Sequence, residues 1–143
     1  MKMQKKIFAG GCALLMICAA AVSVSAGSVV SGGMYQTVRH SNIPGGGEVH
    51  YDTSYGSKKT DNDNYASFKE TYYEAWLGNS AILITKSKAL KSREVDLSYN
   101  KVILARESGV SKDTTYYSAV SSHKFEPSNS CDVIIQFSAN NLK

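Results

Sequence analysis

The feature that most constrains this chain is a succession of short β-prone segments separated by turn-forming residues. Clusters rich in Gly, Pro, Asn and Ser mark the turns, for example at 41–47 and 126–130. The segments between them lie at 34–40, 48–53, 65–77, 81–85, 95–99, 102–105, 114–120 and 131–138. Seven or eight short strands with regular turn signals predict an all-β fold, as a single antiparallel β-sandwich or barrel-like domain.

The stretch 65–77 is the richest in large aromatic rings and contains the only tryptophan, Trp76. We expect it to be the centre of the core, with Trp76 shielded from water, because buried aromatic rings remove the most apolar surface from solvent. Its pattern leaves two structures open. The spacing of residues 65, 68, 72 and 76 fits one face of a helix, whereas its Thr and aromatic content favours a strand starting after Lys69. We favour the strand.

Two further patterns make local predictions. In 48–53, Val49 and Tyr51 alternate with Glu48, His50 and Asp52, which predicts a half-buried strand with the polar side chains in water. Asn100-Lys101 separates 95–99 from 102–105 and predicts a hairpin. The polar, glycine-punctuated segment 55–64 is expected to be an exposed loop.

The N-terminus has the pattern of a secretory signal peptide. A basic start is followed by an apolar run and by small residues before Ala26, so we expect cleavage after Ala26 and one secreted, extracellular domain at 27–143. The alternative is an uncleaved anchor, but the apolar run is short and interrupted by Gly10 and Gly11. Loss of three leader lysines from 16 basic residues leaves 13 against 12 acids, a net charge of +1. That charge gives no basis for nucleic-acid binding.

Cys131 is the one cysteine that remains after cleavage, so no disulfide can form within the mature chain. It lies on the apolar side of the last predicted strand, where a cysteine behaves as a small hydrophobic residue. The alternative is a disulfide-linked dimer through Cys131 in an oxidising space.

Glu48, His50 and Asp52 are candidate metal ligands or acid–base groups, since zinc takes histidine and carboxylate ligands. His40 and His123 would join them only if the fold brings them near. The favoured alternative is an ordinary solvated strand face. Asp61–Asn64 resembles the opening of a calcium loop, but Ala66 and Tyr72 replace the required Gly and Glu, so a hydrated loop is expected.

Candidate binding residues are Lys88 and Lys91, within a basic cluster, and Tyr116 and Tyr117, since tyrosine is enriched at wet interfaces. Solvated loop and half-buried sheet positions are the plainer alternatives. Serines near His123 lack a Gly-x-Ser-x-Gly motif, so no serine hydrolase is predicted.

The order of these features resembles an uncharacterised family of small secreted proteins of Gram-positive bacteria, some encoded near bacteriocin-type loci. The resemblance rests on the signal peptide, the strand at 35–39, Ala75-Trp76-Leu77, the segment 116–119 and the terminal 139–141. A glycine-bounded turn before the Trp strand is replaced here by Asp61–Asn64. The resemblance implies a secreted all-β protein and assigns no catalytic residue.

These observations predict a secreted, non-enzymatic protein that binds at a cell surface or on a competitor, possessing a bacteriocin-like role and no cofactor. One alternative is a small metal-dependent hydrolase that uses His50 and Asp52. The other is a structural or assembly subunit linked through Cys131 or an exposed strand edge.

Overall fold

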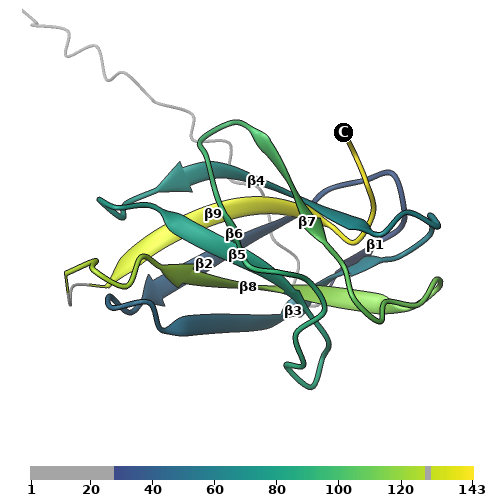
Figure 1. Cartoon of the computed structure of the whole chain (residues 1–143), viewed down its shortest axis with the longest axis horizontal. Coiled ribbons are helices and arrows are strands. Elements are labelled where there is room, and N and C mark those ends of the chain that lie inside the picture. Colours follow the sequence, from purple (N-terminus) through teal and green to yellow (C-terminus); the bar gives the residue numbers. More distant parts are fainter. Residues whose placement is uncertain (1–27, 128–129) are drawn as a thin grey trace, which may run out of the picture.

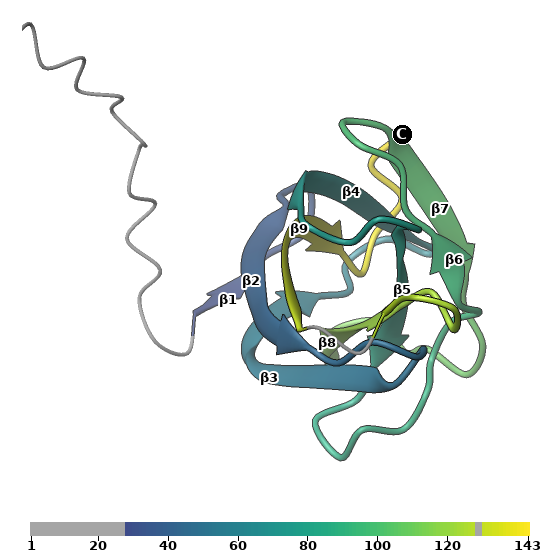
Figure 2. The same ribbon diagram turned by 90° about the vertical axis from the view of Figure 1, so that its left-hand side faces the viewer.

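A computed structural model describes residues 28–127 and 130–143, and this part of the chain is an all-β sandwich without helices. A five-stranded sheet has the order β1-β3-β8-β5-β6, and a four-stranded sheet has the order β2-β9-β4-β7. Figures 1 and 2 show the two sheets facing each other. The strands are β1 (Val29–Val30), β2 (Gln36–Ile43), β3 (Val49–Lys58), β4 (Tyr65–Tyr73), β5 (Asn79–Ile84), β6 (Val95–Asp96), β7 (Val102–Arg106), β8 (Thr115–Ser122) and β9 (Cys131–Ser138). The described residues include no helix long and apolar enough to cross a membrane.

The core lies between the sheets and is centred on Phe68 of β4 and Phe137 of β9. These two residues are register partners, and their rings stack with centroids 6.2 Å apart. Alternate residues of β9 point the same way, so Val133 and Ile135 are fully buried beside Phe137. The last predicted strand is therefore confirmed, including the inward position of Cys131.

The aromatic stretch 65–77 is a strand from Tyr65 to Tyr73, so the helical alternative and the start after Lys69 are wrong. The expectation that its rings fill the core is also wrong, since Phe68 is buried but Trp76 is 87% exposed. The register of β4 on β9 shifts between Glu70 and Tyr72, and the strand ends at Tyr73. The residues after Tyr73 leave the sheet, which carries Trp76 away from the core.

The alternation in β3 is present, but the predicted sides are reversed. Val49 packs on Ile82, Ile84 and Ala119, a small apolar cluster separate from the main core. His50, the register partner of the core residue Val120, contacts the fully buried His40 of β2. Period-two alternation gives the two faces of a strand but cannot say which face meets the second sheet.

Two connections also differ from the expectation. The segment 95–99 does not pair with 102–105, because β6 pairs with β5 in one sheet and β7 pairs with β4 in the other. The segment 55–64 is not an exposed loop, since β3 continues to Lys58, and Ser57 and Lys59 are buried.

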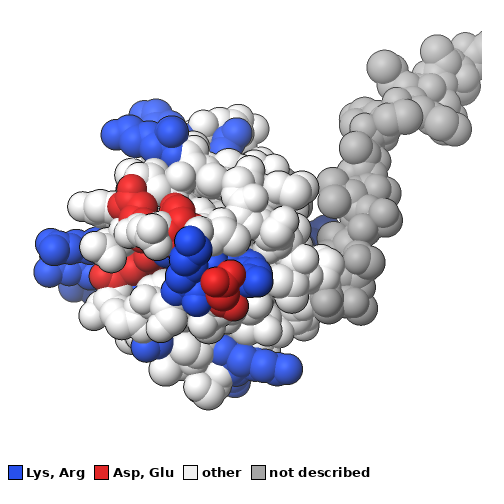
Figure 3. Space-filling view, turned by 90° about the vertical axis from the view of Figure 1, so that its right-hand side faces the viewer, with Lys and Arg blue, Asp and Glu red and all other residues white. Residues whose placement is uncertain are grey.

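The strand directions gather the connections at two ends of the sandwich. The β2–β3, β4–β5 and β8–β9 connections meet at the left-hand end of Figure 1, which faces the viewer in Figure 2. The segments 59–64 and 107–114 and the C-terminus lie at the opposite end. Figure 3 shows that opposite end, where Lys and Arg side chains surround a smaller group of Asp and Glu.

Candidate functional site

The β4–β5 and β8–β9 connections, which lie at the left-hand end of the sandwich in Figure 1, carry three large apolar side chains that are exposed to solvent. Trp76 is 87% exposed, Phe125 71% and Leu77 53%. We call the segments that carry them, 74–78 and 123–127, the aromatic tip. Single exposed apolar residues are ordinary, but several large ones gathered on adjoining loops mark a surface that contacts something else.

The backbone of the aromatic tip is held by Glu126. Its Oε1 accepts a hydrogen bond from the Trp76 backbone N at 2.7 Å, and its Oε2 accepts one from Leu77 N at 2.8 Å. The bend that follows Leu77 is fixed as well. Gly78 has a φ of 93°, a conformation that favours glycine, and its carbonyl accepts from His123 N. The indole is therefore free, while the backbone that presents it is ordered.

A third loop supports the tip. A Cβ at Gly45 would lie 1.9 Å from the carbonyl oxygen of Pro127, so the β2–β3 connection can pack here only with glycine. The Lys124 ammonium lies 4.9 Å from the centre of the Phe125 ring and gives this edge a positive charge.

A hollow of about 200 Å³ lies beside Trp76, lined by Glu74, Trp76, Glu126, Pro127, Ser130 and Cys131. Glu74 accepts hydrogen bonds from Asp132 N at 2.8 Å and from the Tyr72 hydroxyl at 2.7 Å. Burial, assisted by the nearby charges of Glu126, Glu74 and Asp132, raises the pKa of the Cys131 thiol. The thiol therefore stays protonated and is a poor nucleophile.

The structure brings together two of the three histidines. His40 Nδ1 lies 3.3 Å from His50 Nδ1, and His40 Nε2 lies 3.1 Å from Ser118 Oγ. Burial, with a smaller contribution from the charge of His50, lowers the pKa of His40 to about 3. His40 is therefore neutral at physiological pH.

The chain Ser118–His40–His50 has the order of a nucleophile, a base and an orienting group. However, both Ser118 and His40 have no solvent exposure, so the hydroxyl cannot reach an external substrate. We interpret this chain as a satisfied polar network between the two sheets.

The other candidate ligands do not complete a site around this pair. Asp52 Oδ1 accepts a hydrogen bond from Ser54 N at 2.7 Å, Glu48 is exposed before β3, and the His123 ring packs against Phe125. Within residues 28–127 and 130–143, no group of three or more His, Cys, Asp or Glu side chains could hold a metal ion.

The predicted binding residues do not form one surface. Tyr116 is buried and its hydroxyl accepts from Ser111 N at 2.7 Å, so its assignment as a surface residue is wrong. Tyr117 packs half-buried against the small apolar cluster. Lys88 lies over the Tyr51 ring at 5.2 Å, and Lys91 donates to the carbonyl of Gly109. These two lysines lie on the β5–β6 connection and are occupied by contacts within the chain.

The aromatic tip was missed by reasoning from composition, which assigned the rings of the stretch 65–77 to the core. One signal was present in the sequence: Trp76-Leu77 stands directly before Gly78, a residue typical of a turn. A strand that ends before such a dipeptide leaves the two apolar side chains on a loop.

The chain matches no protein-family model, and searches of curated proteins and of solved structures give no match either.

Proposed function

We propose that the chain is exported after loss of residues 1–26 and acts outside the cell as a non-enzymatic binding protein. The aromatic tip is its contact surface, and the partner is a component of a cell envelope. The observation that carries the proposal is Trp76, whose side chain is 87% exposed while its backbone N is bound by Glu126.

The energetics of binding support this use of the aromatic tip. Tryptophan is among the residues most often found to dominate the energy of an interface. Association normally costs entropy because loops and side chains become ordered. The two hydrogen bonds from Glu126 and the close approach of Gly45 to Pro127 order this backbone in advance. Less backbone entropy is therefore lost when a partner binds.

The chemistry around Trp76 indicates what such a partner must offer. An apolar ring and the leucine beside it need an apolar face, such as the CH face of a sugar or an aliphatic side chain. Glu74 and Glu126 in the adjacent hollow place acceptors next to that face, and Lys124 adds a cation. Envelope glycans and envelope proteins both present apolar and hydrogen-bonding groups side by side.

The resemblance to small secreted proteins of Gram-positive bacteria supports the same proposal and extends it to an effect on competing strains. Purified residues 27–143 would then inhibit the growth of related bacteria. Absence of inhibition across related strains would remove the bacteriocin-like part and leave envelope binding as the function.

The test measures binding of purified residues 27–143 to isolated bacterial envelopes by co-sedimentation. Wild type is expected to sediment with the envelopes, and Trp76→Ala and Phe125→Ala are each expected to weaken binding at least tenfold. Tyr65→Ala is the matched control, because Tyr65 is 37% exposed at the opposite end of β4. If wild type does not sediment with the envelopes, the proposed function is wrong. If all three variants lose the same amount of binding, the aromatic tip is not the binding site.

A further inference from the structure

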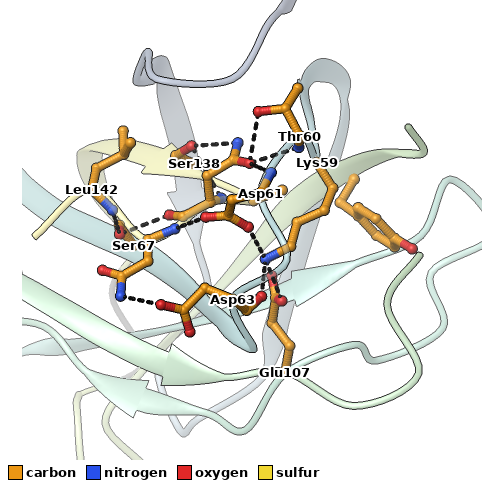
Figure 4. Close-up of polar contacts among 12 residues, drawn as sticks. Lys59, Thr60, Asp61, Asp63, Ser67, Glu107, Ser138 and Leu142 are labelled. Atoms are coloured by element: carbon orange, nitrogen blue, oxygen red, sulfur yellow. Dashed lines mark hydrogen bonds and ion pairs between the residues drawn. The ribbon is translucent and has the colours of Figure 1, made fainter. Parts of the chain in front are cut away.

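The side chain of Lys59 is buried at the end of the sandwich opposite the aromatic tip. It is only 4% exposed, and its Nζ lies 2.7 Å from Glu107 Oε2 and 2.8 Å from Asp61 Oδ1. It also donates to the carbonyl of Asp63. Figure 4 shows the ammonium between these oxygens, with Lys59 following β3 and Glu107 following β7.

Glu107 is the unusual member of this group. Its side chain is 2% exposed, and its second oxygen, Oε1, is buried without a hydrogen-bond partner among the described residues. Burial raises the pKa of Glu107, although the hydrogen bond and charge of Lys59 act in the opposite direction. Separated charges are costly in such a place, and the 2.7 Å contact is a direct path for one proton from Nζ to Oε2, a transfer that would leave a neutral amine beside a neutral acid.

A neutral lysine amine held against a neutral carboxyl group is a nucleophile in contact with an acyl carbon. We propose that Lys59 and Glu107 become joined by an amide bond between Nζ and Cδ. The Nζ lone pair attacks Cδ, and the N–C bond forms as one Nζ proton passes to Asp61 Oδ1. That proton then goes to the departing hydroxyl of Glu107, the C–O bond breaks, and one water molecule leaves. The reaction needs no oxidant or other co-reactant.

The surroundings suit both the proton transfer and the loss of water. Asp61 is 30% exposed, and its other oxygen accepts a hydrogen bond from Asn141 N at 2.8 Å, which holds the carboxylate in position. A hollow of about 160 Å³ beside Lys59, Asp61 and Glu107 gives the water a route out. Asn140 fixes the backbone, since its Oδ1 accepts from Thr60 N and Asp61 N.

Glu107 is the acceptor, rather than Asp61, because its carboxyl group is shielded from water. The Glu107 side chain is 2% exposed, whereas that of Asp61 is 30% exposed and its Oδ2 accepts a hydrogen bond from Asn141 N. A Lys59–Glu107 bond would tie the end of β3 in the five-stranded sheet to the end of β7 in the four-stranded sheet. Such a bond constrains the unfolded chain as a disulfide does, in a described chain whose one cysteine, Cys131, is free.

The test is the intact mass of the purified chain under denaturing and reducing conditions, with its N-terminus established by peptide mapping. Wild type is expected to be lighter than its sequence by one water molecule, and a protease digest is expected to give a branched peptide joining Lys59 and Glu107. Lys59→Arg keeps a long basic side chain at this position but cannot form this amide, so it is expected at its full mass. Lys58→Arg is the matched control, because Lys58 makes a more exposed ion pair with Asp113 and should keep the water loss.

A full wild-type mass that persists after prolonged incubation would overturn the proposal. A water loss that survives Lys59→Arg, or a branched peptide joining Lys59 to Asp61, would overturn it too. Asp61→Asn is expected to slow the appearance of the lighter species after refolding, and an unchanged rate would remove the proton-transfer role of Asp61. None of these outcomes depends on the aromatic tip or on the proposed function.

Discussion

The carboxylate of Glu126 accepts a hydrogen bond from the backbone N of Trp76. Oε1 lies 2.7 Å from Trp76 N, whereas the indole side chain is exposed to solvent. An acidic residue of the β8–β9 connection thus determines the path of the β4–β5 connection. Order in the aromatic tip therefore depends on one side chain that is not part of the exposed surface.

Glu126→Gln should loosen the aromatic tip. The amide keeps one acceptor for Trp76 N or Leu77 N but sets an N–H group against the other, and it loses the charge that strengthens both bonds. We expect the free energy of unfolding to fall by roughly 1.5–3 kcal/mol, the size of one lost hydrogen bond to a charged group. Chemical denaturation measures the change, and hydrogen exchange should quicken at residues 76 and 77. Glu48→Gln, at an exposed position, is the control, and an equal loss in both variants would contradict the role of Glu126.

The exposure of Trp76 gives a spectroscopic prediction. Since it is the only tryptophan, the emission of the folded protein should be that of an indole in water, and acrylamide should quench it freely. Trp76→Ala should change the free energy of unfolding by less than about 0.5 kcal/mol, as for other surface substitutions. A blue-shifted, protected emission would place the indole inside an interface or the core and contradict the structure.

The fold class was predictable because turn residues and short apolar segments recur along the chain. The pairing of strands was not. Asn100-Lys101 has the local form of a hairpin turn, but Val95 pairs with Ala81 and Val102 pairs with Lys69. Long-range pairing decided this connection, and no local pattern reports it.

The candidate site was harder to predict than the fold. Composition counts an aromatic ring as core. Phe68 lies within β4 and is fully buried, whereas Trp76 lies beyond the end of β4 at Tyr73 and is exposed. The His40–His50 contact depends on which face of β3 meets the second sheet. Lys59 was assigned to a polar loop, because a buried ion pair needs a partner 48 positions away, Glu107, that local sequence does not reveal.

Asn140 should contribute more to the free energy of unfolding than most other polar side chains. It is 2% exposed, its Oδ1 accepts from the backbone N of Thr60 and of Asp61, and its Nδ2 donates to the carbonyl of Lys58. Asn140→Ala leaves these groups without partners, and we expect a loss of about 2–4 kcal/mol on denaturation. Asn141→Ala is the control, since its amide bonds Asp63 in an exposed contact. Comparable losses at the two positions would contradict the assignment.

The stacked rings of Phe68 and Phe137 should make the largest apolar contribution to the free energy of unfolding. Phe68 and Phe137 are both fully buried, so Phe137→Ala opens a cavity between the sheets. We expect a loss of about 3–5 kcal/mol in the free energy of unfolding, and Phe137→Leu should lose less because it leaves a smaller void. Phe125→Ala, which removes the same ring from the surface, is the matched control. A loss at Phe125 as large as that at Phe137 would show that the tip, and not this pair, stabilises the fold.

Acidification should destabilise the protein through His40. In the unfolded chain a histidine takes up a proton near pH 6.5, but in the folded chain burial lowers the pKa of His40 to about 3. The unfolded state therefore binds more protons between these two values, and stability falls as the pH is lowered through that window. Each pH unit removes about 1.4 kcal/mol of the free energy of unfolding for a single group. The raised pKa values of Glu70 and Glu107 act in the opposite direction, so the comparison must be made between variants.

The measurement is chemical denaturation at several pH values between 7 and 4 for wild type, His40→Leu and His123→Gln. His40→Leu removes the buried imidazole, so its free energy of unfolding should lose the slope that wild type shows between pH 6 and pH 4, whatever its value at pH 7. His123→Gln should keep the wild-type slope, because His123 is exposed on the aromatic tip. The slope, rather than the absolute stability, identifies the group, since a new cavity or an unpaired Ser118 shifts the whole curve without changing its dependence on pH. A slope that survives in His40→Leu would assign the acid sensitivity to another residue.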